Sequence, residues 1–273
     1  MTQRRAVFFV SDRTGITAET LGHSLLTQFD AHFEHVTLPF TDTLERADAA
    51  LRQIEAANRA NGARSIVFCT IISDEVREAL VGADALVFDF FDTFIAPLER
   101  ELERRSSHTI GRSHGMVDNT TYDVRIDAMN FALSHDDGAV SSHYDEADII
   151  LVGVSRSGKT PTCIYLALQY GVYAANYPLT EEDLTHGGLP RQLRPYRRRL
   201  YGLTIHPDRL ARIREERRPG SRYASLRQCQ YEVARAEALF DASGVPRANS
   251  TAMSIEELAS TIVHTLQLPR RVH

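Results

Sequence analysis

The chain has 273 residues, of which 43% are hydrophobic and 25% are charged, and its formal net charge is −5. These values are typical of a globular protein with one large or two ordinary domains, and the negative charge argues against nucleic acid as a partner. No stretch approaches the ~20 apolar residues that span a bilayer, and the apolar run at 6–10 is too short for a signal peptide, so we expect a cytoplasmic protein with no membrane partner.

The first part of the sequence alternates between strand and helix patterns. Strands are predicted by apolar runs at 6–10, 35–40, 65–72 and 85–91. Helices are predicted at 16–29, 43–62, 73–83 and 93–105. The buried face of the first helix is predicted from near-helical spacing to contain Ile16, Leu21, Leu25 and Phe29. Repeated β-α units of this kind predict a mostly parallel sheet covered on both faces.

A polar stretch at 106–121 interrupts the alternation. A helix is then predicted at 122–135, with core candidates Ile126, Met129, Phe131 and Leu133. The DDG sequence at 136–138 predicts a turn. We therefore place a domain boundary near residue 145, which divides the chain into 1–145 and 146–273.

The second part resumes the alternation. Strands are predicted at 148–154, 172–179, 201–206 and 245–251. Helices are predicted at 159–171, 207–218, 222–244 and 254–266. The last helix begins with Ser254 and Glu257 in the spacing of a capping box. The sequence thus predicts two α/β parts in one chain.

Residues 153–160, GVSRSGKT, match the P-loop pattern G-x-x-x-x-G-K-[ST] between a predicted strand and a predicted helix. Flexible glycine backbone lets successive N–H groups surround a phosphate, and the helix N-terminus adds positive potential. The predicted phosphate-binding residues are Gly153, Val154, Ser155, Arg156, Ser157, Gly158, Lys159 and Thr160. We expect the hydroxyl of Thr160 to bind Mg²⁺ and Lys159 to reach the outer phosphate oxygens.

Lys159 is the only lysine among 31 basic Lys and Arg residues. A slender ammonium fits inside a nest of backbone amides, where a planar guanidinium has little room. We therefore hypothesise that arginine could replace lysine elsewhere in this chain but not at this position.

The sequence resembles the phosphoenolpyruvate synthase regulatory proteins, which are related to the regulatory protein of pyruvate, phosphate dikinase. The resemblance spans nearly the whole chain, including SDRTGITAETLGHSLLTQF, GRSHG, YDVRIDAMNFALSHDDG, GVSRSGKTPTCIYLALQYGVYAANYPL and SRYASLRQCQYEVARAEALF. The segments NST at 249–251 and YASLRQC at 223–229 favour the synthase branch over the dikinase branch.

The resemblance implies a bifunctional enzyme whose protein substrate is phosphoenolpyruvate synthase. It would inactivate the synthase by ADP-dependent phosphorylation of a threonine, and reactivate it by phosphate-dependent removal of that group, which releases pyrophosphate. It also suggests a homodimer. We expect a Rossmann-like N-terminal sheet and a P-loop kinase-like C-terminal sheet, with ADP, inorganic phosphate and the target threonine bound in a cleft between them.

Several other residues are candidates for this chemistry. Asp136 or Asp137 could accept the threonine hydroxyl proton, although a DDG sequence is often only a turn. Asp12 follows the first strand, where sheets of this class bind ligands, but it could simply cap a helix. Asp89 lies in a weakly Walker-B-like run in the other domain.

Basic side chains form the remaining candidates. Arg112 and His114 lie in the polar GRSHG loop, which is either functional or a surface linker. Arg156 could touch a transferred phosphate. Arg197, Arg198 and Arg199 form either a lid or docking patch or simply a solvated basic face.

Three alternatives remain open. The chain could be a P-loop kinase of a small metabolite, or a nucleotide-gated binding module without catalysis. It could also regulate pyruvate, phosphate dikinase in the same way. The cysteines Cys69, Cys163 and Cys229 are odd in number and widely spaced, so buried free thiols are expected rather than disulfides or a zinc site.

Overall fold

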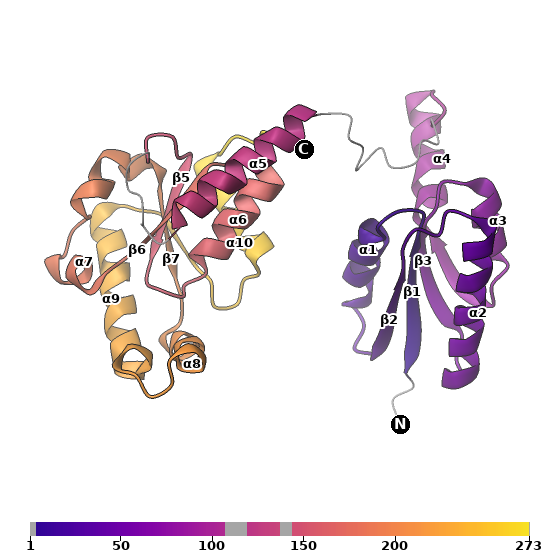
Figure 1. Ribbon diagram of the computed structural model, residues 1–273, viewed down its shortest axis with the longest axis horizontal. Helices are drawn as coiled ribbons and strands as arrows, with labels where there is room; N and C mark the ends of the chain where they lie inside the picture. The colour runs from indigo at the N-terminus through magenta and orange to yellow at the C-terminus, as the bar shows by residue number, and fades with distance from the viewer. Residues whose placement is uncertain (1–3, 107–118, 137–143, 273) are drawn as a thin grey trace. The chain divides into compact units, whose positions relative to one another are not determined.

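The computed structural model describes residues 4–106, 119–136 and 144–272. The chain forms two compact units, Met1–Gly115 and Met116–His273. Each unit is built around its own four-stranded parallel sheet, which confirms the predicted fold class of two α/β parts (Figure 1).

The first unit contains β1 (Arg5–Ser11), α1 (Ile16–Leu26), β2 (Phe33–Leu38), α2 (Leu44–Asn61), β3 (Ser65–Thr70), α3 (Asp74–Val81), β4 (Ala85–Asp89) and α4 (Phe90–Leu102). Its strand order is β2-β1-β3-β4. Helices α2 and α3 pack on one face of the sheet, and α1 packs on the other. The strands of the centre, β1 and β3, are buried on both faces, which explains why they appear in the sequence as continuous apolar runs.

The predicted buried face of α1 is wrong. Ile16, Leu21, Leu25 and Phe29 are 42–66% exposed. The helix instead meets the sheet through Ala18, Gly22 and Leu26. A Cβ at Gly22 would lie 2.6 Å from the rings of both Phe9 and Phe68, so small residues allow close approach to the sheet and large ones are left outside.

The second unit begins with α5 (Asn119–Ser134), β5 (Ile149–Gly153), α6 (Lys159–Tyr170), β6 (Ala174–Pro178) and α7 (Glu181–His186). It continues with the 3-10 helix η2 (Arg191–Arg199), β7 (Leu200–Thr204), α8 (Pro207–Arg217), η3 (Arg222–Ala224), α9 (Leu226–Ser243), β8 (Arg247–Asn249) and α10 (Ile255–Leu266). The strand order is β6-β5-β7-β8, so β5 lies inside the sheet. One face carries α5, α6 and α10, and the other carries α8 and α9.

Several details differ from the sequence predictions. The units divide at 115/116 rather than near 145 because α5 packs on the second sheet through Ala128 and Ala132. In α5 the predicted core residue Leu133 is 53% exposed, while Phe131 is buried. The helix predicted at 222–244 starts only at Leu226, where Ser225 caps it.

Helix α7 was not predicted, although Thr180 and Asp183 form a capping box at its start. The predicted capping box of Ser254 and Glu257 is present. The three cysteines are free and buried, as expected. Within the described ranges, no helix is both long enough and apolar enough to cross a membrane.

Candidate active site

The loop 153–160 joins the carboxyl end of β5 to the amino end of α6, as the motif predicts. Gly158 precedes the helix with φ 93° and supplies no side-chain cap. The backbone N–H groups of the first turn of α6 therefore lack a side-chain acceptor at the capping position, which is the arrangement that favours an anion at a helix N-terminus.

The two motif glycines serve different physical needs. Gly158 adopts the left-handed backbone that glycine favours. Gly153 does not adopt this backbone conformation. Glycine is needed there because a Cβ would lie 2.3 Å from the carbonyl oxygen of Leu203 on β7. Within the loop, the left-handed conformation expected of a nest is found at Arg156, with φ 73°, and its side chain is exposed.

Lys159 lies within the loop rather than outside it. Its side chain is only 5% exposed, and Nζ donates to the carbonyl oxygen of Val154 at 2.9 Å. The ammonium is thus buried and hydrogen bonded to the backbone of the loop itself, consistent with the slender cation that the motif requires. Ser157 is also fully buried, and its Oγ has no hydrogen-bond partner among the described residues.

Thr160 and Asp136, which the sequence singled out separately, are in direct contact. The Thr160 hydroxyl donates to Asp136 Oδ1 at 2.7 Å. Asn176, on β6, donates from Nδ2 to the same carboxylate oxygen and lies 3.4 Å from the Thr160 hydroxyl. The segment just after α5, the start of α6 and the middle of β6 therefore contribute three oxygen- or amide-bearing side chains to one point beside the loop.

This donor set fits magnesium. Mg²⁺ prefers hard oxygen ligands and usually takes only one or two from the protein, with water and substrate phosphates completing the octahedron. A hydroxyl and a carboxylate beside a phosphate-binding loop are such a pair. In the described part of the chain no cluster of three or more His, Cys, Asp or Glu could hold a metal ion by itself.

A fully buried arginine supports the loop through a hydrogen bond to its backbone. Arg214, on α8, donates from Nη2 to the carbonyl oxygen of Ser155 at 3.1 Å and to the carboxylate of Glu232 at 2.6 Å. Its Nη1 donates to the carbonyl oxygen of Tyr223 at 3.0 Å, and its guanidinium lies 4.0 Å from the centre of that ring. The Tyr223 hydroxyl is hydrogen bonded to Ser155 Oγ at 2.8 Å.

These bracing residues were missed from the sequence. One signal for Arg214 was available: it follows Leu210 by four residues, on the face of α8 that Leu210 buries. A charged residue on the buried face of an amphipathic helix needs a partner, and the partner here is Glu232 on α9. Asn176 gave no signal, because its role depends on a contact between distant segments.

The remaining candidates are distributed as follows. Asp12, in the first unit, is 5% exposed and accepts a hydrogen bond from the Ile72 backbone at 3.0 Å. Burial raises the pKa of its carboxyl, and the Ile72 bond opposes that rise. Arg112, His114 and Asp137 lie outside the described residues. Asp89 caps α4 and forms an ion pair with Arg77. These two contacts give the Asp89 carboxylate a structural role.

The arginine cluster also has structural partners. Arg197 donates to the carbonyl oxygen of Ser243, and Arg199 donates to those of Asp145 and Ala147. These two side chains hold η2 against neighbouring segments. Arg198 is exposed, and it makes no such hydrogen bond to any of the described residues.

The fold and this site together define a two-unit parallel α/β protein with a glycine loop poised for an anion at the N-terminus of a helix. The family model described as kinase/pyrophosphorylase matches residues 7–263. The chain belongs to the kinase/pyrophosphorylase family.

Close relatives cover the whole chain. A protein of Halorhodospira halophila is 65% identical over 273 residues, 100% of each chain. One of Alkalilimnicola ehrlichii is 64% identical over 270 residues, 99% of this chain and 98% of its own, and one of Laribacter hongkongensis is 54% identical over 273 residues, 99% and 100%. Each carries the provisional name phosphoenolpyruvate synthase regulatory protein, which confirms the family resemblance seen in the sequence.

Proposed function

We propose that this chain is a bifunctional protein kinase and phosphorylase that controls phosphoenolpyruvate synthase. The observation that carries the proposal is the loop 153–160, with Lys159 hydrogen bonded to its backbone and the Thr160–Asp136 pair beside it, in a chain of the kinase/pyrophosphorylase family. The provisional name of the relatives supplies the protein substrate.

In the forward direction, the threonine hydroxyl of the synthase attacks the β-phosphorus of ADP, the β-phosphoryl group is transferred, and AMP leaves. Phosphoryl transfer needs mainly charge neutralisation and in-line positioning. The backbone N–H groups before α6 and the Lys159 ammonium bind the phosphates. Magnesium held by Thr160 and Asp136 would offset the charge of the phosphate oxygens.

The hydroxyl proton needs an acceptor. Asp136 accepts hydrogen bonds from both Thr160 and Asn176, and this engagement favours a role in holding the cation and Thr160. Asp137, the next residue in the chain, is then the candidate base. In the reverse direction, an oxygen of inorganic phosphate attacks the phosphothreonine phosphorus, the bond from that phosphorus to the threonine oxygen breaks, pyrophosphate is formed, and the threonine oxygen takes up a proton.

The test is to incubate the purified chain with purified phosphoenolpyruvate synthase and either ADP or ATP. We expect threonine phosphorylation and AMP with ADP, and pyrophosphate when phosphorylated synthase is given inorganic phosphate. Lys159→Ala should abolish both reactions, and Arg218→Ala, an exposed change at the end of α8, should leave both intact. Phosphorylation with ATP alone, or none with either nucleotide, would refute the proposal.

A further inference from the structure

The second unit carries polar side chains at the carboxyl edge of its sheet, on the side of the loop 153–160 that faces away from β6. The chain runs from β5 to its neighbour β6 and then crosses to β7 on the other side of β5, with β8 beyond it. In parallel α/β sheets, ligands bind in the crevice outside the carboxyl ends of the strands, at the point where the strand order reverses. The segments that follow β7 and β8 therefore lie along the same crevice as the loop.

The segment 249–251, at the end of β8, lies beside the phosphate-binding loop. A Cβ at Gly158 would lie 4.0 Å from the Cβ of Ser250, which places this segment next to the N-terminus of α6. Ser250 is tied to the end of β7, because its backbone N–H and its hydroxyl both donate to the carbonyl oxygen of Thr204, at 2.9 Å and 3.1 Å. The ends of β7 and β8 thus form one fixed wall on this side of the loop.

Asn249 and His206 are the exposed side chains of this wall. The Oδ1 atom of Asn249 accepts a hydrogen bond from the backbone N–H of Thr251 at 2.9 Å. This bond fixes the amide, and its Nδ2 donor makes no hydrogen bond to any described residue. The backbone N–H of His206 donates to the Thr251 hydroxyl at 2.7 Å, and the ring Nδ1 lies 3.0 Å from Asp208 Oδ2. A fixed amide donor and an oriented flat ring are therefore open to a ligand in the crevice.

The two sides of the loop differ in the chemistry that they offer. On the side of β6, Thr160, Asp136 and Asn176 meet at one point, where a hydroxyl and a carboxylate suit a cation and the phosphoryl group that it neutralises. On the side of β7 and β8, the wall offers an amide and an aromatic ring, which suit the hydrogen-bonding edge and the flat face of a base. Two strand spacings of about 4.8 Å each separate β5 from β8, a distance that a ribose bridges between phosphate and base.

We propose that the nucleoside of bound ADP lies over the carboxyl ends of β7 and β8, with its base stacked on His206 and hydrogen bonded to Asn249. The threonine of the protein substrate then approaches the phosphates from the side of β6. This placement rests on the nucleotide-dependent function proposed above and adds the direction in which the nucleotide lies. The forward reaction uses ADP, whereas the reverse reaction uses inorganic phosphate, which has no nucleoside. Asn249 and His206 therefore contribute to the first reaction and not to the second.

Calorimetry of the full-length chain compares the binding of ADP with that of inorganic pyrophosphate, each with Mg²⁺. Asn249→Ser removes the Nδ2 donor but keeps a side-chain oxygen for the N–H of Thr251. His206→Ala removes the ring but keeps the backbone bond to Thr251. We expect either variant to raise the Kd of ADP at least about fivefold and to leave the Kd of pyrophosphate unchanged. Gln169→Ala, which changes an exposed amide at the far end of α6, is the matched control and should change neither.

Kinetics with the synthase separate the two reactions. The same two variants should raise the KM for ADP in the forward reaction and leave the KM for inorganic phosphate in the reverse reaction unchanged. Variants that weaken pyrophosphate binding as much as ADP binding, or that bind ADP as the wild type does, would overturn the proposal. If the variants change ADP binding as expected but the wild-type chain fails to phosphorylate the synthase, the proposed function is refuted and the placement of the nucleoside stands.

Photolabelling locates the base directly. An ADP analogue with an azide on its adenine ring is bound to the wild-type chain and illuminated, and the chain is then digested with trypsin. We expect the label on the peptides 200–209 and 248–270, which contain His206 and Asn249. A label confined to the peptide 160–191, which contains β6, would place the base on the other side of the loop and overturn the proposal.

Discussion

The guanidinium of Arg214 holds the carbonyl oxygen of Ser155 at 3.1 Å, so the conformation of the loop 153–160 is fixed by a side chain from α8. Arg214 has no exposed surface and pairs with Glu232 at 2.6 Å. Removing one member of a buried ion pair leaves the other charge without compensation, which is costlier than losing the bond itself.

We therefore expect Arg214→Met to lower the free energy of unfolding by about 3–5 kcal/mol. The cause would be the unpaired carboxylate of Glu232 together with the unsatisfied carbonyl of Ser155. Urea denaturation followed by circular dichroism measures it. The control is Arg218→Met, four residues further along and exposed, where we expect almost no change. Equal stability of the two variants would show that Arg214 does not brace the loop.

The Tyr223→Phe variant tests the support of the loop while leaving the packing of the fold in place. It removes only the hydroxyl that is hydrogen bonded to Ser155 Oγ at 2.8 Å and keeps the ring under Arg214. One neutral hydrogen bond is worth about 1 kcal/mol, so we expect the KM for ADP to rise about fivefold with kcat little changed. Tyr231→Phe, on the exposed side of α9, should leave both constants unchanged. A fall in kcat at constant KM would contradict this role.

The Thr160–Asp136 pair predicts a dependence on magnesium. Thr160→Val removes both the oxygen ligand and the donor to Asp136, and we expect synthase phosphorylation to fall roughly 100-fold, because a metal that neutralises phosphate charge contributes several kcal/mol. Thr160→Ser keeps the hydroxyl and should keep most of the rate. Initial rates over a magnesium titration check both variants. A Thr160→Val enzyme as active as Thr160→Ser would remove Thr160 from the cation site.

The sequence predicted the strands, most helices and the glycine loop because each is encoded by neighbouring residues. Continuous apolar runs predicted β1, β3 and β5, and the GVSRSGKT motif located the loop between β5 and α6. Asp136 and Thr160 were both candidates, but only the packing of α5 beside α6 brings them to 2.7 Å. The contributions of Asn176, Arg214 and Tyr223 arise from segments far apart in the chain.

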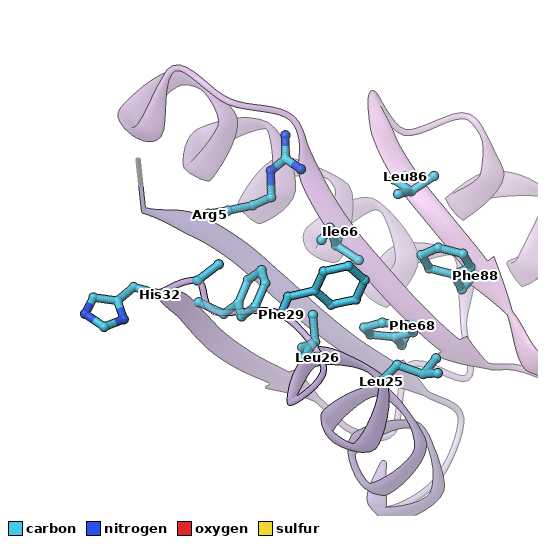
Figure 2. A pocket seen from close by; sticks show the side chains of 11 residues that line it. Arg5, Leu25, Leu26, Phe29, His32, Ile66, Phe68, Leu86 and Phe88 are labelled. Atoms are coloured by element: carbon cyan, nitrogen blue, oxygen red, sulfur yellow. The ribbon is translucent and has the colours of Figure 1, made fainter. Parts of the chain in front are cut away.

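Helix α1 shows how a reliable pattern can mislead. Large apolar residues at helical spacing predicted its buried face, yet the contact with the sheet is made by Ala18, Gly22 and Leu26. Spacing identifies an apolar stripe but not what will cover it. Leu25 and Phe29 are exposed and line an open apolar pocket of the first unit instead (Figure 2).

Gly153→Ala tests the close approach of β5 to β7. A methyl group there would meet the carbonyl oxygen of Leu203 at 2.3 Å, and neither backbone can shift without disturbing the sheet. We expect the free energy of unfolding to fall by about 1–3 kcal/mol. Gly188→Ala is the matched control, because nothing lies within 4 Å of the added atom. Urea midpoints compare the two, and a Gly153→Ala protein as stable as the control would show that the strands can separate at no cost.

Cys69 predicts how stability changes at alkaline pH. Burial, and secondarily the carboxylate of Asp89, raise the pKa of its thiol from 9.0 to about 12. The unfolded chain therefore loses this proton first as pH rises, so the stability that the protonated thiol contributes is complete below pH 9 and declines between pH 9 and 12. One such group changes the free energy of unfolding by up to about 1.4 kcal/mol per pH unit.

Cys69→Ala should reduce this alkaline slope by up to about 1.4 kcal/mol per pH unit. The shorter side chain also lowers the free energy of unfolding by a small amount that is the same at every pH. Urea denaturation at a series of pH values from neutral to alkaline gives the slope. Tyr122→Phe, which removes an ionisable group that is 65% exposed, is the control and should leave the slope as it is. Because the slope and not the absolute stability is compared, a cavity left by the alanine cannot mimic the effect. Identical slopes in Cys69→Ala and the wild type would mean that the thiol ionises as readily in the folded chain as in the unfolded one.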